Sequence, residues 1–586
     1  MEKRSLAAVL RLHQEGRLSE AAHGYSEILI EEPDNADAIH LLGVIRFQTG
    51  DLDAAGTLVR RAIALNGMDV RFHANLGRIE KARGELPAAI IAYRHALTLL
   101  PDAADVHSDL AAALADQEEW QSSLDHADRA LAIDGRYAAA AFNRGVALRG
   151  MGQQRAAVAA FETAVQCDPT FANGYFELAR LHQQAGQNEA ARQAYRKSLS
   201  LDPALHEARC NLGNILRAEG QLESALSCYN VVLDAHPDLA EVHCNKGVTL
   251  QEMGDRDAAI DCYRHAIFLQ PNDAEAHRNL SMALLQGGQF EEGWQEFEWR
   301  WQTRHFARIR RNWQKPQWQG QMLSGETVLV HAEQGFGDSF QFCRYIPLIV
   351  GRGGRVVVEV PDPVREVIQT VGGVSQMVVP GAAVPDFDFH VPMMSLPGAF
   401  RTTAADIPAP RSYLSVPPRL RNTGSDRPAI KAGRKRIGIV WKGSSEHARN
   451  LWRSPGIDVF RPLLTVGPAD FCSLQKDDGS SDLKSSGLFR QIDDRQAGMK
   501  TFAETAALID HLDLVITPDT AVAHLSSAMG CQTWILLPYV AEWRWGMVRE
   551  DCPWYPSARL FRQSAPGDWT GVITRVREAL IGFVRR

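Results

Sequence analysis

The first half of the chain repeats with a period of 34 residues, and this period limits the possible folds more than any other feature. A glycine recurs at that spacing, with Glu118 at the one position where the glycine is missing. Alanines, aromatic residues and closing prolines follow in the same register. The recurring residues are Gly16, Gly50, Gly84, Gly152, Gly186, Gly220, Gly254 and Gly288; Ala21, Ala55, Ala89, Ala157, Ala191, Ala225 and Ala259; Tyr25, Tyr93, Phe161, Tyr195, Tyr229, Tyr263 and Phe297; and Pro33, Pro101, Pro169, Pro203, Pro237 and Pro271.

Each recurring residue type has a physical role in a pair of antiparallel helices. Glycine ends the first helix, alanine lets the two helices approach closely, the aromatic ring fills the gap, and proline prevents the second helix from continuing. Because a single repeat cannot bury its apolar face alone, we predict an α-solenoid superhelix of about eight and a half stacked repeats with a concave surface. The pattern resembles the tetratricopeptide repeat (TPR), and we assign the solenoid to residues 1–305.

Asparagines occupy one position of the first helix in five repeats. A ladder of amides can pair with the backbone of an extended peptide without reading its side chains. We therefore expect an acceptor peptide to bind there, although a purely structural role of asparagine in the repeat remains the alternative. The candidate acceptor-peptide-binding residues are Asn75, Asn143, Asn211, Asn245 and Asn279.

An aromatic segment follows the last half repeat. Trp294, Phe297 and Trp301 have helical spacing, which predicts a stripe that packs the end of the solenoid onto the next domain. A sugar-stacking platform is the alternative interpretation.

The second half alternates strands and helices, which is typical of parallel sheets with crossover helices. We expect two α/β lobes, residues 306–420 and 421–586, joined by a proline- and arginine-rich stretch. The expected strands are 327–331, 355–360, 377–380, 387–394, 437–441, 471–475, 512–516 and 533–537, and the expected helices are 338–350, 458–466, 502–510, 520–529 and 571–584. Ligands of such sheets bind at the carboxyl ends of the strands.

Two segments of the second half resemble a known enzyme family. GFGDSFQFCRY, from Gly335, and TPDTAVAH, from Thr517, resemble loops of bacterial glycosyltransferases with the GT-B fold that are related to heptosyltransferases. The fusion with TPRs resembles bacterial protein glycosyltransferases, including those that modify flagellin, and by architecture the eukaryotic O-linked N-acetylglucosamine transferase. The resemblance implies two Rossmann-like lobes, a nucleotide-sugar donor as substrate and no cofactor.

Asp338 is the candidate catalytic base. The matching aspartate of heptosyltransferases is thought to accept the proton of the acceptor, and a carboxylate beside a glycine loop is suited to that role. Its alternative role is the N-cap of the helix that follows.

We find no DxD triplet in a convincing loop and no clustered histidines, and therefore expect no metal. Cations and helix N-termini must then stabilise the donor phosphate. The loop before the helix at 520–529 offers such an N-terminus, although Asp519 or Thr520 could serve only as its cap. The candidate donor-binding residues are Gly335, Gly337, Lys442, Ser444, Arg453, Gln475, Lys476, Asp519, Thr520 and His524. Arg544 could bind a phosphate or carboxylate in bidentate fashion. The aromatic residues from Tyr539 to Tyr555 are more typical of a core than of a sugar site.

Composition excludes several classes of function. The net charge of −7 and pI of about 6.3 do not indicate a nucleic-acid-binding protein. No segment has the apolar length of a membrane span or the pattern of a signal peptide, and the nine cysteines form no CxxC pair, so we expect a cytoplasmic protein with reduced thiols.

These features together predict a protein O-glycosyltransferase that modifies Ser or Thr of an acceptor held by the solenoid. The resemblance makes flagellin the first candidate acceptor and a CMP-activated nonulosonic acid the first candidate donor, with UDP-N-acetylhexosamine and ADP-heptose still open. Two alternatives remain: a TPR scaffold with an inactive transferase region, and an enzyme of surface-glycan assembly.

Overall fold

The computed structural model describes residues 5–421, 433–443, 453–476 and 479–586. It divides into two compact units, Met1–Cys228 and Tyr229–Arg586. The boundary falls inside a repeat helix, so the second unit contains the last repeats together with both sheets.

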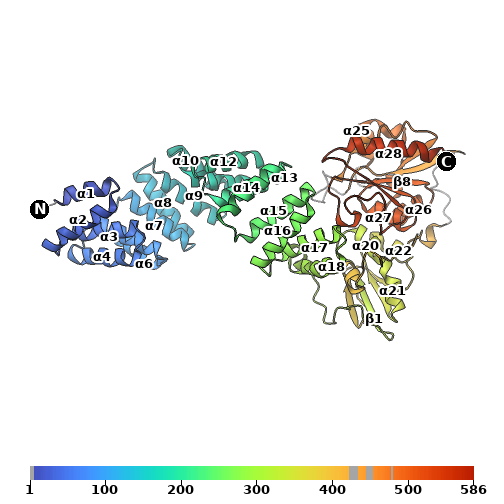
Figure 1. The fold of residues 1–586 in the computed structure, drawn as a ribbon, viewed down its shortest axis with the longest axis horizontal. Coiled ribbons are helices and arrows are strands. Elements are labelled where there is room, and N and C mark those ends of the chain that lie inside the picture. Colours follow the sequence, from blue (N-terminus) through green and yellow to red (C-terminus); the bar gives the residue numbers. More distant parts are fainter. Residues whose placement is uncertain (1–4, 422–432, 444–452, 477–478) are drawn as a thin grey trace. The chain divides into compact units, whose positions relative to one another are not determined.

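The first unit consists of helices that pack as antiparallel neighbours (Figure 1). They are α1 (Leu6–Gln14), α2 (Leu18–Glu31), α3 (Ala36–Gln48), α4 (Leu52–Leu65), α5 (Val70–Ala82), α6 (Leu86–Leu99), α7 (Ala104–Asp116), α8 (Trp120–Ile133), α9 (Ala138–Gly150), α10 (Gln154–Cys167), α11 (Ala172–Gln184), α12 (Asn188–Leu201) and α13 (His206–Ala218), and α14 (Leu222–Ala235) crosses the boundary. The recurring alanines are fully buried, as the period predicts. A glycine in the first helix also allows the two helices of a repeat to pack closely. A Cβ added to Gly77 would lie 2.4 Å from the Tyr93 ring, and one added to Gly145 would lie 2.6 Å from the Phe161 ring.

The recurring glycines end their helices in the left-handed conformation, with φ between 73° and 90°. Glu118 takes the same position with φ of 61°, and the backbone N–H groups of Glu118 and Glu119 bond back to Ala115 and Leu114 as in the glycine repeats. The backbone geometry of the repeat is therefore retained where the glycine is absent. The cost is the steric clash of the Glu118 Cβ in the left-handed backbone conformation.

Glu118→Gly is expected to raise the free energy of unfolding by about 1 kcal/mol, because glycine takes φ above zero without the clash of a Cβ. Urea unfolding followed by circular dichroism measures the change. Glu119→Gly is the matched control, since Glu119 has φ of −80° and should gain nothing. Equal behaviour of the two variants would contradict the interpretation.

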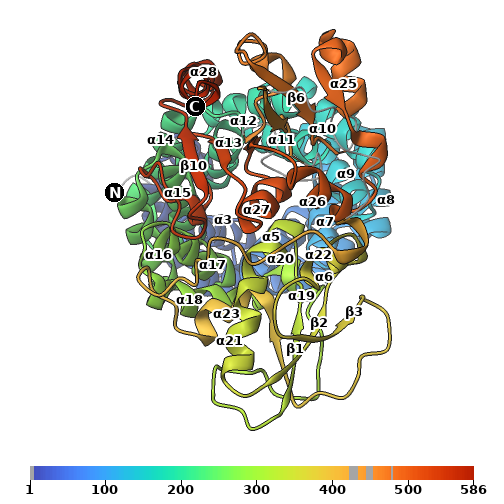
Figure 2. The same cartoon turned by 90° about the vertical axis from the view of Figure 1, so that its right-hand side faces the viewer.

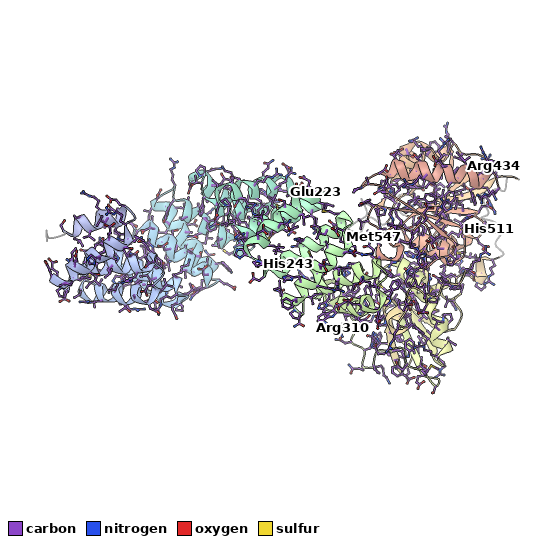
Figure 3. All side chains as sticks on the ribbon, viewed as in Figure 1. Glu223, His243, Arg310, Arg434, His511 and Met547 are labelled. Carbon is purple, nitrogen blue, oxygen red and sulfur yellow. The ribbon has the colours of Figure 1, made fainter. Side chains whose placement is uncertain are left out.

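Several repeats share a hydrogen bond that the sequence analysis missed. In each of them the donor is the histidine near the start of the first helix. Its Nε2–H donates to the carbonyl six residues earlier: His73 to Gly67 at 2.9 Å, and His243, labelled in Figure 3, to Pro237 at 2.8 Å. His107 and His277 make the same bond to Pro101 and Pro271. This bond fixes the turn that leads from one repeat into the next.

The second unit continues with repeat helices and then forms two sheets. Its elements are α15 (Ala240–Met253), α16 (Arg256–Leu269), α17 (Ala274–Gln286), α18 (Phe290–Phe297), α19 (Arg304–Ala307), β1 (Thr327–His331), α20 (Phe336–Phe342), α21 (Ile346–Gly351), β2 (Arg355–Glu359), α22 (Asp362–Ile368), β3 (Val374–Val378), β4 (Phe389–Pro392), α23 (Leu396–Ala399), β5 (Lys435–Ile439), β6 (Ala469–Ser473), α25 (Gly479–Ser486), β7 (Ile492–Asp494), α26 (Phe502–Ile509), β8 (Leu514–Pro518), α27 (Ala521–Ala528), β9 (Thr533–Leu537), β10 (Ala558–Arg562) and α28 (Trp569–Val584). All described strand pairs within the two sheets are parallel.

The first sheet has the order β3-β2-β1-β4 and the second sheet the order β10-β9-β8-β5-β6-β7. Figure 2 shows β1, β2 and β3 side by side. One hydrophobic core continues from the last repeat through the first sheet to α26, α27 and one face of the second sheet. A second core joins the other face of the second sheet to α28.

Three details differ from the expectations. The helix expected at 338–350 is broken into α20, a short 3-10 turn and α21, because Pro347 lacks the N–H that a continuous helix needs. The helix expected at 458–466 is only a 3-10 turn, Ile457–Phe460. Strands β7 and β10, which were not expected, form the two edges of the second sheet.

The end of the solenoid packs onto both sheets, as the aromatic spacing predicts. The Trp294 indole N–H donates to the Thr402 carbonyl at 3.0 Å, and its ring meets the Trp543 ring edge to face at 5.3 Å. Gln286 of α17 donates to the Ala541 carbonyl at 2.8 Å. Trp543, Trp545, Trp554 and Tyr555 are buried, which confirms the core interpretation for these four residues. For Tyr539 that interpretation is wrong, because its side chain is exposed.

Candidate functional site

Asp338 lies in the first turn of α20, directly after β1, at the carboxyl edge of the first sheet. The helix begins at Phe336 with Gly335 as its N-cap, so the alternative role of Asp338 as N-cap is wrong. Asp338 Oδ1 accepts a hydrogen bond from Arg544 Nη2 at 2.7 Å, across 206 residues of sequence. Arg544 is 8% exposed, and its Nη1 lies 2.9 Å from Glu542 Oε2.

The start of α27 follows β8 in the second sheet in the same way. Thr520 is its N-cap, and its hydroxyl accepts from Ala523 N–H. Burial would raise the pKa of Asp519, but its hydrogen bond with His524 and the charges of His524, Arg544 and Arg453 outweigh that effect and hold the pKa at about 2. Asp519 is therefore ionised at neutral pH.

The N-terminal halves of α20 and α27 meet at Gly337 and His524. A Cβ added to Gly337 would lie 2.7 Å from His524 Cδ2, so only glycine allows α20 to approach α27 this closely. The His524 Nδ1 atom lies 2.7 Å from the Tyr555 hydroxyl, and its Nε2 lies 3.7 Å from Asp519 Oδ1. Burial lowers the pKa of His524, and Arg544 lowers it further against the opposing effect of Asp519. The site thus gathers groups from both sheets.

Gly337→Ala is expected to lower the free energy of unfolding by about 1–3 kcal/mol, because the methyl group overlaps the His524 ring in a packed interior. Urea unfolding of the full chain provides the measurement. Gly335→Ala is the matched control, since its Cβ would meet only Asp338 Oδ2 at an ordinary 3.5 Å. If both variants are equally stable, the close approach of the two helices is wrong.

Arg344 is a buried cation that the sequence analysis did not select. Its guanidinium donates to the Tyr413 hydroxyl at 2.6 Å and to the Trp554 carbonyl. Its central carbon also lies 4.6 Å from the centre of the Tyr555 ring, whose hydroxyl contacts His524. Arg344, in the 3-10 turn Cys343–Tyr345 that follows α20, therefore supports the second-sheet side of the site. Tyr413 and Trp554 are 69 and 210 residues away in sequence, so no local pattern could identify these two partners.

The other candidate donor-binding residues are placed around β5 and β6. Lys442 Nζ pairs with Asp482 Oδ2 at 2.7 Å. Gln475 accepts from the backbone N–H of Lys442 at 3.1 Å, and Lys476 donates to the Met499 carbonyl at 2.9 Å. The guanidinium of Arg453 lies against Gly443, where an added Cβ would be 2.7 Å from Nη2.

Of this second group, Arg453 is near enough to Asp519 for its positive charge to help lower the pKa of that carboxyl. The side chains of Lys442, Gln475 and Lys476 are engaged within the protein. Ser444 lies outside the described residues.

The asparagine ladder is half-buried and partly engaged. Asn143 Nδ2 donates to the Ser108 carbonyl at 2.9 Å, and Asn75 Nδ2 lies 2.8 Å from His40 Nε2. Asn279 makes a longer contact to Cys244, and Asn211 bonds to the Tyr195 hydroxyl. Asn143 Nδ2 also donates to the Ser108 hydroxyl at 3.0 Å, and Asn75 Oδ1 accepts from Arg78 at 3.1 Å. These amides, which have two donors and two acceptor sites, thus use part of their hydrogen-bonding capacity within the solenoid. Binding of a peptide by this ladder stays a prediction.

Two adjoining cavities lie at the carboxyl ends of β1 and β4, with volumes of about 170 and 310 Å³. Both are lined by Trp301, Arg311 and His331, and the larger one also by Arg310 of the connector after α19 (Figure 3) and by Trp313. Burial, with smaller effects of His390 and Arg311, lowers the pKa of His331 to about 3. The cavities offer indole rings and polar groups beside the loop that carries Asp338.

Among the residues with described positions, no group of three or more His, Cys, Asp or Glu side chains is arranged to hold a metal ion. None of the described helices is both long and apolar enough to cross a membrane.

Comparisons with known proteins concern mainly the repeats. TPR family models match residues 12–79, 138–171, 160–193, 213–254 and 240–273. Protein FlbA from Caulobacter vibrioides is 25% identical over 323 residues, which are 51% of this chain and 54% of FlbA. The chain thus spans about half the length of this curated relative. The N-terminal half is a TPR solenoid.

Two solved structures are also similar over part of the chain. YrrB, described as a TPR protein with an unusual peptide-binding site, is 25% identical and covers 32% of this chain and 95% of its own, with a TM-score of 0.29. PilF of Pseudomonas aeruginosa is 22% identical and covers 36% of this chain and 98% of its own, with a TM-score of 0.34.

Proposed function

We propose that the chain is a metal-independent protein glycosyltransferase of the GT-B type. In this proposal the two sheets belong to two Rossmann-like lobes, and the TPR solenoid holds the acceptor. The observation that carries the proposal is the 2.7 Å contact between Asp338, after the first-sheet strand β1, and Arg544, beside the Asp519 loop of the second sheet. A carboxylate beside one sheet and a guanidinium beside the other thus meet at the carboxyl edges of the sheets, where ligands of such folds bind, and this supports the proposal.

The chemistry assigns a role to each side of the site. The acceptor hydroxyl oxygen bonds to the anomeric carbon, the bond from that carbon to the phosphate oxygen breaks, and its electron pair leaves with the phosphate. Asp338 accepts the hydroxyl proton. Arg453, Arg544 and the N-terminus of α27 offset the charge that develops on the leaving phosphate. The cavities lined by Trp301 and His331 receive the acceptor segment.

The substrates follow from the sequence resemblance rather than from the geometry. We take a Ser or Thr hydroxyl of a cytoplasmic protein as the acceptor, with flagellin as the first candidate and a CMP-activated nonulosonic acid as the first donor. The intact mass of flagellin and of other abundant proteins, compared in cells with and without this gene, tests the proposal. A loss of whole sugar masses supports it and indicates the donor, whereas unchanged masses for every protein contradict a protein acceptor.

A second candidate is a TPR scaffold whose transferase region is inactive. It is favoured by the engagement of Lys442 with Asp482 and of Lys476 with the Met499 carbonyl, which leaves fewer cations for a donor. Titration with UDP, ADP and CMP separates the two candidates, because a scaffold without a donor site binds none of them.

A further inference from the structure

Arg544 occupies a fixed position between several carboxylates. It lies in the 3-10 turn Trp543–Trp545, whose two tryptophans are buried and anchor the backbone on both sides. Its Nη2 donates to Asp338 at 2.7 Å, and its Nη1 lies 2.9 Å from Glu542. Its Nε is buried and has no partner among the described residues. A buried guanidinium with a remaining donor can form a further bond to an incoming anion.

Without a ligand, the carboxylates around Arg544 already more than offset its single positive charge. Asp338 and Glu542 contact the guanidinium directly, and Asp519, ionised at neutral pH, also interacts with its charge. A phosphate that reaches the N-terminus of α27 therefore approaches carboxylates as well as Arg453 and Arg544. Two anions that compete for one guanidinium repel each other, so a phosphate bound there favours a state in which Asp338 no longer holds Arg544.

We propose that Arg544 is exchanged between Asp338 and the phosphate of the nucleotide donor, so that donor binding releases Asp338 to accept the acceptor proton. The inference rests on the proposed function and adds an order of events to it. Before the donor binds, the Arg544 bond occupies Asp338 Oδ1. After the donor binds, that oxygen faces the acceptor hydroxyl. Arg544 is thus a positioning residue that couples the two sides of the site.

A double-mutant cycle tests the exchange with UDP, ADP, CMP and inorganic pyrophosphate as probes. Calorimetric titration measures the affinity of wild type, Asp338→Asn, Arg544→Gln and the double variant. Asp338→Asn is expected to tighten binding of the best probe by about tenfold, equivalent to about 1.4 kcal/mol, because the competitor for Arg544 is gone. In the Arg544→Gln background, the same change is expected to have little effect.

Controls separate this exchange from a general change in charge or from misfolding. Asp406→Asn removes an exposed carboxylate that accepts only from the Thr403 hydroxyl, and it should leave the affinity unchanged. If Arg544→Gln unfolds, Arg544→Lys keeps the cation but loses the fork of donors, and Asp338→Asn should then tighten binding less than in wild type. Urea midpoints of all variants are measured alongside.

The possible outcomes are distinct. If Asp338→Asn tightens binding equally in the wild-type and Arg544→Gln backgrounds, the gain reflects simple removal of a charge and overturns the exchange. An Asp338→Asn variant that binds no better than wild type also overturns it. In either case nucleotide binding by the wild type leaves the proposed donor site standing. Absence of binding by wild type and Asp338→Asn for all four probes overturns both the exchange and the proposed donor site.

Discussion

Arg300→Met is expected to lower the free energy of unfolding by about 3–5 kcal/mol, because it leaves a buried carboxylate without its partner. Arg300 is fully buried where the solenoid ends, and its guanidinium holds both oxygens of Glu333 at 2.9 and 3.1 Å. It also donates to Glu298 and to the Ser395 hydroxyl. The network joins the last repeat to the first sheet, so its loss should also loosen the base of the loop that carries Asp338.

The effect of Arg300→Met should depend on pH. Burial already raises the pKa of Glu333 in the wild type, and Arg300 opposes that shift. Without Arg300 the pKa in the folded state rises further above its unfolded value, so protonation favours the folded variant and stability falls as the pH increases through that range. We therefore expect a smaller loss at pH 5 than at pH 8, measured by urea unfolding with tryptophan fluorescence.

Two further variants identify the cause of the loss. Arg300→Met/Glu333→Gln removes the uncompensated charge and should recover a substantial part of the stability. Arg365→Met breaks an exposed ion pair with Asp362 and should change stability by no more than about 1 kcal/mol. An Arg300→Met loss that is equal at both pH values, with no recovery in the double variant, would contradict a buried ion pair.

The repeats could be predicted from the sequence because their signals are local. The position of each glycine, and even the left-handed conformation at Glu118, follows from a fixed spacing within one helix pair. The strands next to Asp338 and Asp519 were also expected, since a short apolar run before a turn is visible along the chain. The broken helix at Pro347 was missed because the apolar pattern continues across the proline.

The contacts that assemble the site have no such local signal. Arg544 was recognised as a phosphate-binding candidate, but its partner Asp338 is 206 residues away, and neither residue indicates the other. Arg300 and Arg344 look like surface charges in the sequence and are buried in the fold. Conversely, Lys442 stands in a turn suited to phosphate, yet its ammonium pairs with Asp482. Side-chain partners depend on how the sheets pack, which the order of strands alone does not determine.

Asp338→Asn is expected to lower the rate of sugar transfer by about 10²–10⁴-fold, the range that a general base contributes. The amide keeps the size of the side chain and its place in the first turn of α20, but it cannot accept the hydroxyl proton. Arg453→Ala should also lower transfer strongly, because it removes a cation that acts on the Asp519 loop. Transfer of labelled sugar to the acceptor identified by intact mass measures both effects, with Asp406→Asn as control.

Acceptor binding, nucleotide binding and sugar transfer, measured together, distinguish a variant that has lost catalysis from one that has lost its fold. A misfolded variant binds neither donor nor acceptor, whereas Asp338→Asn should bind the acceptor normally and the nucleotide more tightly while transferring almost no sugar. Arg453→Ala should bind the acceptor normally and the nucleotide more weakly, since its guanidinium lies beside the turn after β5. Transfer at the wild-type rate by both variants would exclude this site as the centre of the reaction. Loss of transfer together with tighter nucleotide binding in Asp338→Asn would show that the same carboxylate serves the acceptor and restrains Arg544.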